Sequence, residues 1–303
     1  MRVLGMRIVH SSISRRSSIQ LVTKSLTVAA LISLSSVLAI AQESEKTKQT
    51  SVANSPVGQN LPLEIGKDDP TKFFDSAELV ACCQAINSGD LPALSNAISL
   101  KLDVNAPGYG GVTLLHWALA RKNFEAFELL LKGGASPDAK LTHKLSGLAG
   151  YFIEGDSVLM SSLWFGMSRL KFFDAALPYT KDPNQRRKNG QTLLMIHLRQ
   201  FVGVQDKCIE AMLKVGVDVN AQDNAGSTAL HQGIAHGHYT QCETLLRSGA
   251  DPSIRDTKGL TAVDFAETEI ERIQKNPNAM REPLRSDLTQ LTSLVESMKQ
   301  AKK

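Results

Sequence analysis

Apolar residues from Phe73 onward recur in pairs of short stretches with helical spacing, and polar turns separate them. The clearest pair lies within Asp223–Arg255, where apolar positions three and four residues apart run through ALHQGIA and then YTQCETLLR. A His-Gly break separates the two stretches, and GADP follows the second. The aspartate, glycine and threonine of this segment return 33 residues later in DTKGLT, which predicts a repeat architecture of helix-turn-helix units.

This spacing places about six units between residues 73 and 301. Their first helices are expected to open at Ala77, Thr113, Ser157, Thr192, Thr228 and Thr261. The first and last units depart from the pattern, as terminal repeats do. Thr113 and Ser157 are 44 residues apart instead of 33, so about 11 residues are inserted between Leu141 and Asp156. A shorter insertion falls around residues 201–204.

The fifth unit carries D-x-x-G-x-T-x-L-H, then G-H, then L-L-x-x-G-A-D-P, and this pattern resembles an ankyrin repeat. The resemblance implies an all-α ankyrin-repeat solenoid of about six helix-turn-helix units with atypical terminal caps. Each unit buries only one face of its helices, so stacking of neighbours is required for stability. The implied function is a non-catalytic module that binds another protein along its turn tips and first helices.

The first 41 residues contain basic side chains and no acidic ones, and they end in an apolar run that closes with AIA. This arrangement predicts a secretory signal peptide cleaved after Ala41. A flexible linker, residues 42–72, is then expected to precede the repeat domain at 73–301. Two alternatives stay open, because a similar leader serves as a mitochondrial transit peptide or, if it is retained, as a membrane tether.

The leader also changes the charge balance. Of the 34 basic residues five lie in the leader, which leaves 29 against 30 acidic residues. The mature chain is therefore nearly neutral, and the basic pI gives no argument for a nucleic-acid partner. The four cysteines favour buried apolar positions over disulfides, since Cys82 and Cys83 are adjacent and Cys208 and Cys242 occupy apolar helix positions.

The candidate chemistry is sparse. His231, His236 and His238 are the nearest approach to a metal cluster, but no cysteine or carboxylate completes a tetrahedral site. The resemblance assigns His231 and His238 to positions where histidine serves backbone hydrogen bonds. Catalytic serine, phosphate-loop and zinc-protease motifs are not found in the sequence. We therefore expect neither a cofactor nor a metal, and no enzymatic activity.

The resemblance transfers partner-binding positions onto turn tips and first helices. These positions are Tyr109, Val112, Arg121, Trp164, Phe165, Arg187, Lys188, Arg199 and His236. Two features exceed the general pattern: the aromatic pair Trp164–Phe165 and the basic tip around Arg187. They predict an acidic or apolar-acidic protein partner on the third and fourth units. The alternative is that Trp164 fills space under the insertion and that the basic tip is only solvated.

The leading interpretation is a periplasmic or secreted binding protein without stable membrane insertion after leader cleavage. Resemblance to exported bacterial ankyrin-repeat proteins suggests two roles, an accessory factor in peroxide defence or an immunity protein against an exported toxin. The competing interpretation is a mitochondrial or membrane-tethered scaffold.

Overall fold

A computed structural model of the chain describes residues 63–301, except 148–149, 164–166, 201–204 and 277–283. In chain order the elements are β1 (Glu64–Ile65), η1 (Pro70–Lys72), α2 (Ala77–Ser88), α3 (Leu91–Ser99), η2 (Tyr109–Gly111), α4 (Leu114–Arg121), α5 (Phe124–Lys132), β2 (Leu145–Gly147), β3 (Gly150–Phe152), α6 (Val158–Ser162), α7 (Met167–Ala176), η3 (Leu177–Tyr179), α8 (Leu193–Leu198), α9 (Asp206–Lys214), α10 (Ala229–Ala235), α11 (Tyr239–Arg247), α12 (Ala262–Gln274) and α13 (Leu284–Ala301).

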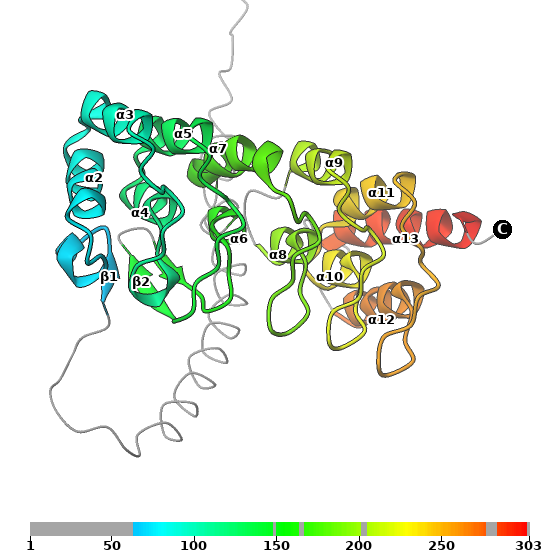
Figure 1. The fold of residues 1–303 in the computed structure, drawn as a ribbon. Helices are drawn as coiled ribbons and strands as arrows, with labels where there is room; N and C mark the ends of the chain where they lie inside the picture. The colour runs from blue at the N-terminus through cyan, green and yellow to red at the C-terminus, as the bar shows by residue number, and fades with distance from the viewer. Residues whose placement is uncertain (1–62, 148–149, 164–166, 201–204, 277–283, 302–303) are drawn as a thin grey trace, which may run out of the picture. The chain divides into compact units, whose positions relative to one another are not determined.

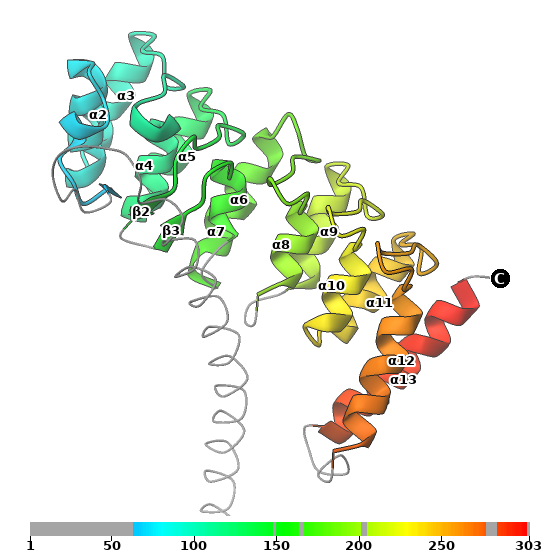
Figure 2. The same ribbon diagram turned by 90° about the horizontal axis from the view of Figure 1, so that it is seen from below.

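The helices form two stacked layers (Figures 1 and 2). The first helices of the six units make one layer, and the second helices make the other. The all-α solenoid expected from the sequence is confirmed. Leu130 and Leu245, which belong to the leucine runs expected to pack between units, are fully buried in one continuous apolar cluster. Truncation of such a leucine to alanine typically costs about 2–5 kcal/mol.

The second to sixth units each begin at a turn glycine with a positive φ, placed two residues before the helix-capping residue. Gly155 keeps this position in the irregular third unit with φ +86°, and Ser157 then accepts a hydrogen bond from the Met160 amide at 3.1 Å. At Gly190 a side chain is also excluded by space, because a Cβ would lie 2.5 Å from the Asn224 side-chain oxygen. The predicted start of the third unit at Ser157 is therefore correct.

Asparagine side chains join the closing turns of successive units. Each donates to a glycine carbonyl of the next unit and accepts from a backbone N–H two residues further on. The pairs of partners are Gly134 and Ser136 for Asn105, Gly216 and Asp218 for Asn184, and Gly249 and Asp251 for Asn220, at 2.7–3.1 Å. These bonds fix the distance between units at the turns, where apolar packing is thin.

Asp138 takes this place between the second and third units. Its carboxylate accepts from the Thr180 hydroxyl at 2.5 Å, the Lys181 amide at 2.7 Å and the buried Gln185 side chain at 3.0 Å. A carboxylate can accept more hydrogen bonds than an amide oxygen, which suits the longer connection at this junction.

The insertion is a β-hairpin, an outcome that the sequence analysis did not anticipate. Strand β2 pairs antiparallel with β3, with Leu145 opposite Phe152. Strand β1 pairs parallel with β2, with Glu64 opposite Ser146. Phe152 is almost fully buried, so the base of the hairpin joins the core while its strands lie beside the turn tips.

Residues 63–72, which were expected to belong to a flexible linker, contain β1 and η1 and pack against the repeat domain. Ile65 is fully buried, and the Arg121 guanidinium donates to the Gly66 carbonyl at 2.8 Å. Burial of one large aliphatic side chain stabilises by roughly 1.5–3 kcal/mol, enough to hold a short strand that also gains sheet hydrogen bonds.

The last unit ends the solenoid with two long helices. On α13, Leu291, Leu294 and Met298 are fully buried against α11 and α12, and the opposite face is polar and exposed. This confirms the predicted amphipathic C-terminal cap. Within the described residues, every helix is too short or too polar to cross a membrane.

Candidate partner-binding surface

The turn tips form a continuous edge of the solenoid because neighbouring tips are joined through the backbone. Successive amide-to-carbonyl bonds of 2.6–3.0 Å run from Tyr109 to Phe73, Thr142 to Gly110, Asn224 to Asn189 and Thr257 to Ala225. Among the described residues, the tip of the fourth unit and the insertion are joined by ion pairs instead. The edge is therefore a rigid row of turns, suited to recognition of an extended surface.

One of these ion pairs is buried and bidentate. The Arg187 Nε donates to Asp156 Oδ1 at 2.7 Å, and Nη2 donates to Oδ2 at 2.5 Å. The side chain of Asp156 is 1% exposed and that of Arg187 is 10% exposed. Arg187 was expected to contact a partner from a basic turn tip. That expectation is wrong for its guanidinium, whose carboxylate partner comes from within the chain.

The neighbouring pair is exposed. Lys188 Nζ lies 2.6 Å from Glu154 Oε1, with side-chain exposures of 72% and 45%. Hydrogen bonding to Lys188 and its charge lower the pKa of Glu154. Solvent screens such a pair strongly, so it contributes little free energy. A carboxylate of a partner can therefore replace Glu154 beside the Lys188 ammonium with only a small loss of free energy.

Tyr109 is the exposed aromatic residue of this edge. Its side chain is 51% exposed, and its ring stacks on His143 of the insertion with centroids 5.3 Å apart and planes at 25°. Glu154, from the same insertion, pairs with Lys188 at the tip of the fourth unit. The insertion therefore connects the tip of the second unit to that of the fourth.

The other predicted contact residues differ in how accessible they are. Val112 is fully buried and cannot contact a partner, because its extended backbone, directly before the N-cap Thr113 of α4, places its side chain in the core. Arg121 is half-buried, with its guanidinium on the Gly66 carbonyl. Arg199 is exposed, and His236 is half-buried with Nδ1 bonded to the Gln232 carbonyl at 2.9 Å. Trp164 and Phe165 lie outside the described residues.

The histidines of the repeat pattern are structural, as expected. His231 Nδ1 accepts from the Thr228 amide at 3.1 Å, and its Nε2 lies 3.2 Å from the Leu260 carbonyl of the next unit. His238 Nε2 lies 2.8 Å from the Gln200 carbonyl. Within the described residues, no group of three or more histidines, cysteines or carboxylates could hold a metal ion.

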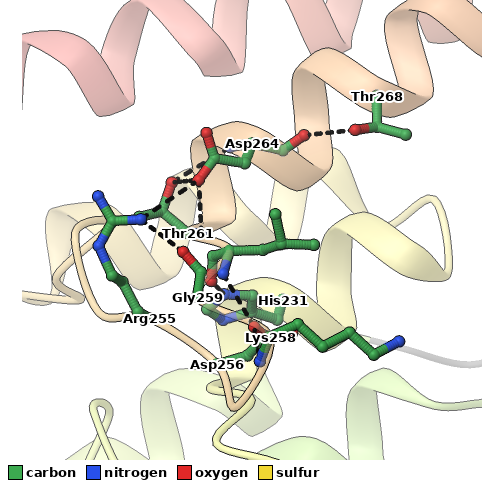
Figure 3. Close-up of polar contacts among 9 residues, drawn as sticks. His231, Arg255, Asp256, Lys258, Gly259, Thr261, Asp264 and Thr268 are labelled. Carbon is green, nitrogen blue, oxygen red and sulfur yellow. Dashed lines mark hydrogen bonds and ion pairs between the residues drawn. The ribbon is translucent and has the colours of Figure 1, made fainter.

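The sixth unit replaces this histidine with Asp264 (Figure 3). Its carboxylate accepts from the Thr261 amide and hydroxyl, both at 2.8 Å, and the Asp264 amide donates to the Thr261 hydroxyl at 3.2 Å. The substitution keeps the helix cap and adds negative charge at a helix N-terminus, which is favourable. Arg255 lies 4.0 Å from the same carboxylate.

Burial suppresses the reactivity of the titratable groups in the core. It raises the pKa of the Cys208 thiol to about 11 and lowers the pKa of His116 to about 3. A buried thiol with a raised pKa is a poor nucleophile. The four cysteines are free and buried, in keeping with their predicted role as small apolar residues. These groups serve packing and capping, and the accessible chemistry is that of the turn tips.

Asp156 and His143, two of the insertion residues that connect the tips, are not among the positions expected from the sequence to bind a partner. Only a weak indication of their role is present in the sequence. Charged residues stand directly before the capping Ser157, in an insertion that does not match the repeat pattern. Their partners could not be assigned without the path of the hairpin.

Two family models match the chain, "Ankyrin repeats (3 copies)" over residues 159–256 and "Ankyrin repeats (many copies)" over residues 82–131. Similar proteins include the ADP-ribosylation factor GTPase-activating protein AGD4 of Arabidopsis thaliana, 35% identical over 86 residues, which cover 28% of this chain and 11% of that protein. The nuclear factor NF-kappa-B p105 subunit of Gallus gallus is 30% identical over 156 residues, which cover 51% of this chain and 14% of that protein. The chain thus spans a small part of these relatives.

Solved structures share the fold. An ankyrin repeat domain from Acinetobacter baumannii AYE has a TM-score of 0.53 and 22% identity, covering 71% of this chain and 97% of that one. The ankyrin repeat domain of Bcl-3 has a TM-score of 0.51 and 22% identity, covering 71% of this chain and 85% of that one. At this identity the likeness concerns the fold alone.

We predict that Arg187→Met lowers the free energy of unfolding by about 3–5 kcal/mol, because it removes the cation that is paired with the buried Asp156 carboxylate. Lys188→Met, the matched control one residue away, should cost less than about 1 kcal/mol because its ion pair is exposed. Urea unfolding of both variants measures the difference. Addition of Asp156→Leu to Arg187→Met should recover much of the loss, and equal effects of the two single variants would contradict the role given to Arg187.

Stability should also fall in mild acid. Burial lowers the pKa of His197 from 6.5 to about 4, and that of His116 from 6.5 to about 3. The unfolded chain therefore binds protons that the folded chain does not, so unfolding becomes easier as the pH falls from about 6.5 toward 4. We expect a slope of about 1–3 kcal/mol per pH unit near pH 5. His197→Asn should flatten the slope in urea titrations, and an unchanged slope would rule out this contribution.

Proposed function

From the premise that this chain is an ankyrin-repeat protein, we propose that it acts without catalysis, by binding another protein along its turn tips. The observation that carries the proposal is the continuous edge of tips joined by backbone hydrogen bonds. Because the edge is ordered before binding, little conformational entropy is lost when a partner docks. The buried thiols and imidazoles favour the same interpretation, since they are withdrawn from substrate chemistry.

The first helices contribute less to this surface than the tips. In α8, every residue from Leu193 to Leu198 is buried, so Arg199 at its end is the first exposed position. In α10 the exposed residue is Ala235. The proposed surface therefore consists of the tips together with the C-terminal ends of the first helices.

The test is site-specific photocrosslinking in the native cell. A crosslinking amino acid at Ala225 or Lys258, both exposed at tips, should trap one and the same protein. The controls are Lys132 and Lys214, exposed on the second layer of helices. Crosslinks that arise only from the second layer, or from no position, would contradict binding along the tips.

We infer that this binding takes place in the periplasm or outside the cell. The basis is the basic, acid-free leader that ends in AIA before Gln42. Two roles fit an exported binder, an accessory factor in peroxide defence and an immunity protein. The identity of the crosslinked protein, a peroxide-removing enzyme or a toxin, decides between them.

Export is tested on the mature protein. N-terminal sequencing of the chain recovered from the exported fraction should begin at Gln42. Replacement of Ala39 and Ala41 by a bulky residue such as phenylalanine should block cleavage, because the protease site requires small side chains. A chain that keeps Met1, or that begins elsewhere inside an organelle, would favour the tethered or mitochondrial scaffold.

A further inference from the structure

We propose that Tyr109 and His143, with Lys140 beside them, form the anchor site for an acidic peptide segment that carries an aromatic or large apolar side chain. The inference rests on the proposed function, protein binding along the tips, and assigns it a location and a partner chemistry. We call these three residues the Tyr109 site.

The first argument is exposure. Aromatic rings supply much of the binding energy at interfaces, and a ring that is half-exposed on a turn tip loses water-accessible surface on contact. Tyr109 is 51% exposed, and His143 is also exposed although it stacks on that ring. The two rings offer a flat surface against which an apolar or aromatic side chain can pack.

The second argument is rigidity. The Tyr109 amide donates to the Phe73 carbonyl at 2.6 Å, and the Thr142 amide donates to the Gly110 carbonyl at 2.9 Å. The Thr142 hydroxyl lies 2.9 Å from His143 Nδ1 and orients the imidazole. Both rings are thus held in place before binding, which reduces the entropy lost on docking.

The third argument is charge. From residue 139 to residue 153 the chain contains Lys140, His143 and Lys144 and no acidic residue. The carboxylates that flank this segment point to other partners, Asp138 to the third unit and Glu154 to Lys188. The Lys140 backbone carbonyl approaches Gly111, so the backbone of this exposed lysine runs beside the tip that carries Tyr109. The surface therefore attracts carboxylates next to its aromatic pair.

The sequence predicts that an acidic partner binds the third and fourth units, whereas this proposal assigns its binding to a different surface. The Arg187 guanidinium is occupied by Asp156, so it cannot provide the positive charge. The Tyr109 site lies on the second unit and the insertion instead of the third and fourth units. Lys188, whose ammonium is paired with Glu154 of the insertion, extends the site toward the fourth unit.

The experiment uses a random peptide library displayed on phage and panned against the mature chain. We expect the recovered peptides to combine aspartate or glutamate with an aromatic or large apolar residue. A fluorescent synthetic copy of the most enriched peptide then serves as the probe in anisotropy titrations. Tyr109→Ala should weaken its binding at least about tenfold, as loss of an aromatic hot spot does.

The matched control is Tyr179→Ala, since Tyr179 is 43% exposed at the end of η3, the short helix that follows α7. That variant should bind the peptide like the unmodified chain. Lys140→Glu should weaken binding and Tyr109→Phe should retain most of it, and circular dichroism checks that each variant is folded. If Tyr109→Ala misfolds, Lys140→Glu and His143→Ala carry the test.

The outcomes separate the two proposals. Peptides without acidic residues, or acidic peptides that bind Tyr109→Ala and Lys140→Glu unchanged, would overturn the Tyr109 site and leave binding along the tips intact. Failure of the library together with failure of photocrosslinking from Ala225 and Lys258 would overturn both.

Discussion

The buried ion pair between Asp156 and Arg187 holds the two halves of the solenoid in register. A repeat unit is stable only when its neighbour covers its apolar face, so every junction must keep a fixed spacing. The insertion interrupts the backbone bonds between tips at the junction of the third and fourth units. There the bidentate pair supplies the fixed distance, because a guanidinium and a carboxylate meet in one geometry.

Every junction between units thus requires a fixed spacing, and different polar side chains provide it at different junctions. Asn105, Asn184 and Asn220 bridge to a glycine carbonyl of the next unit, whereas Asp138 collects several donors from a longer connection. These polar links sit at the turns, where packing is weakest, and the leucines of the helices supply the burial. Stability is therefore distributed along the stack.

Much of the fold follows from the sequence because the units repeat, so that the start of one regular unit predicts where the other units begin. The spacing of 44 residues from Thr113 located the third unit at Ser157 even though its helices are irregular, and the departure of the last unit from the pattern predicted a terminal cap. The hairpin could not be predicted, since Leu145 and Phe152 are neighbours only once β2 pairs with β3. For the same reason Val112 and Arg187 were placed on the surface: spacing locates a residue in its unit, but burial depends on what the insertion covers.

The reassignment of Arg187 changes how charge on a repeat protein is interpreted. A run of basic residues on a tip is evidence for an acidic partner only if no carboxylate of the chain reaches it. Here the insertion brings Asp156 to Arg187 and Glu154 to Lys188 of that tip, while its own acid-free segment leaves positive charge beside Tyr109. An insertion in a solenoid can therefore move a recognition site by one or two units without altering any repeat residue, because it redistributes which charges are already paired.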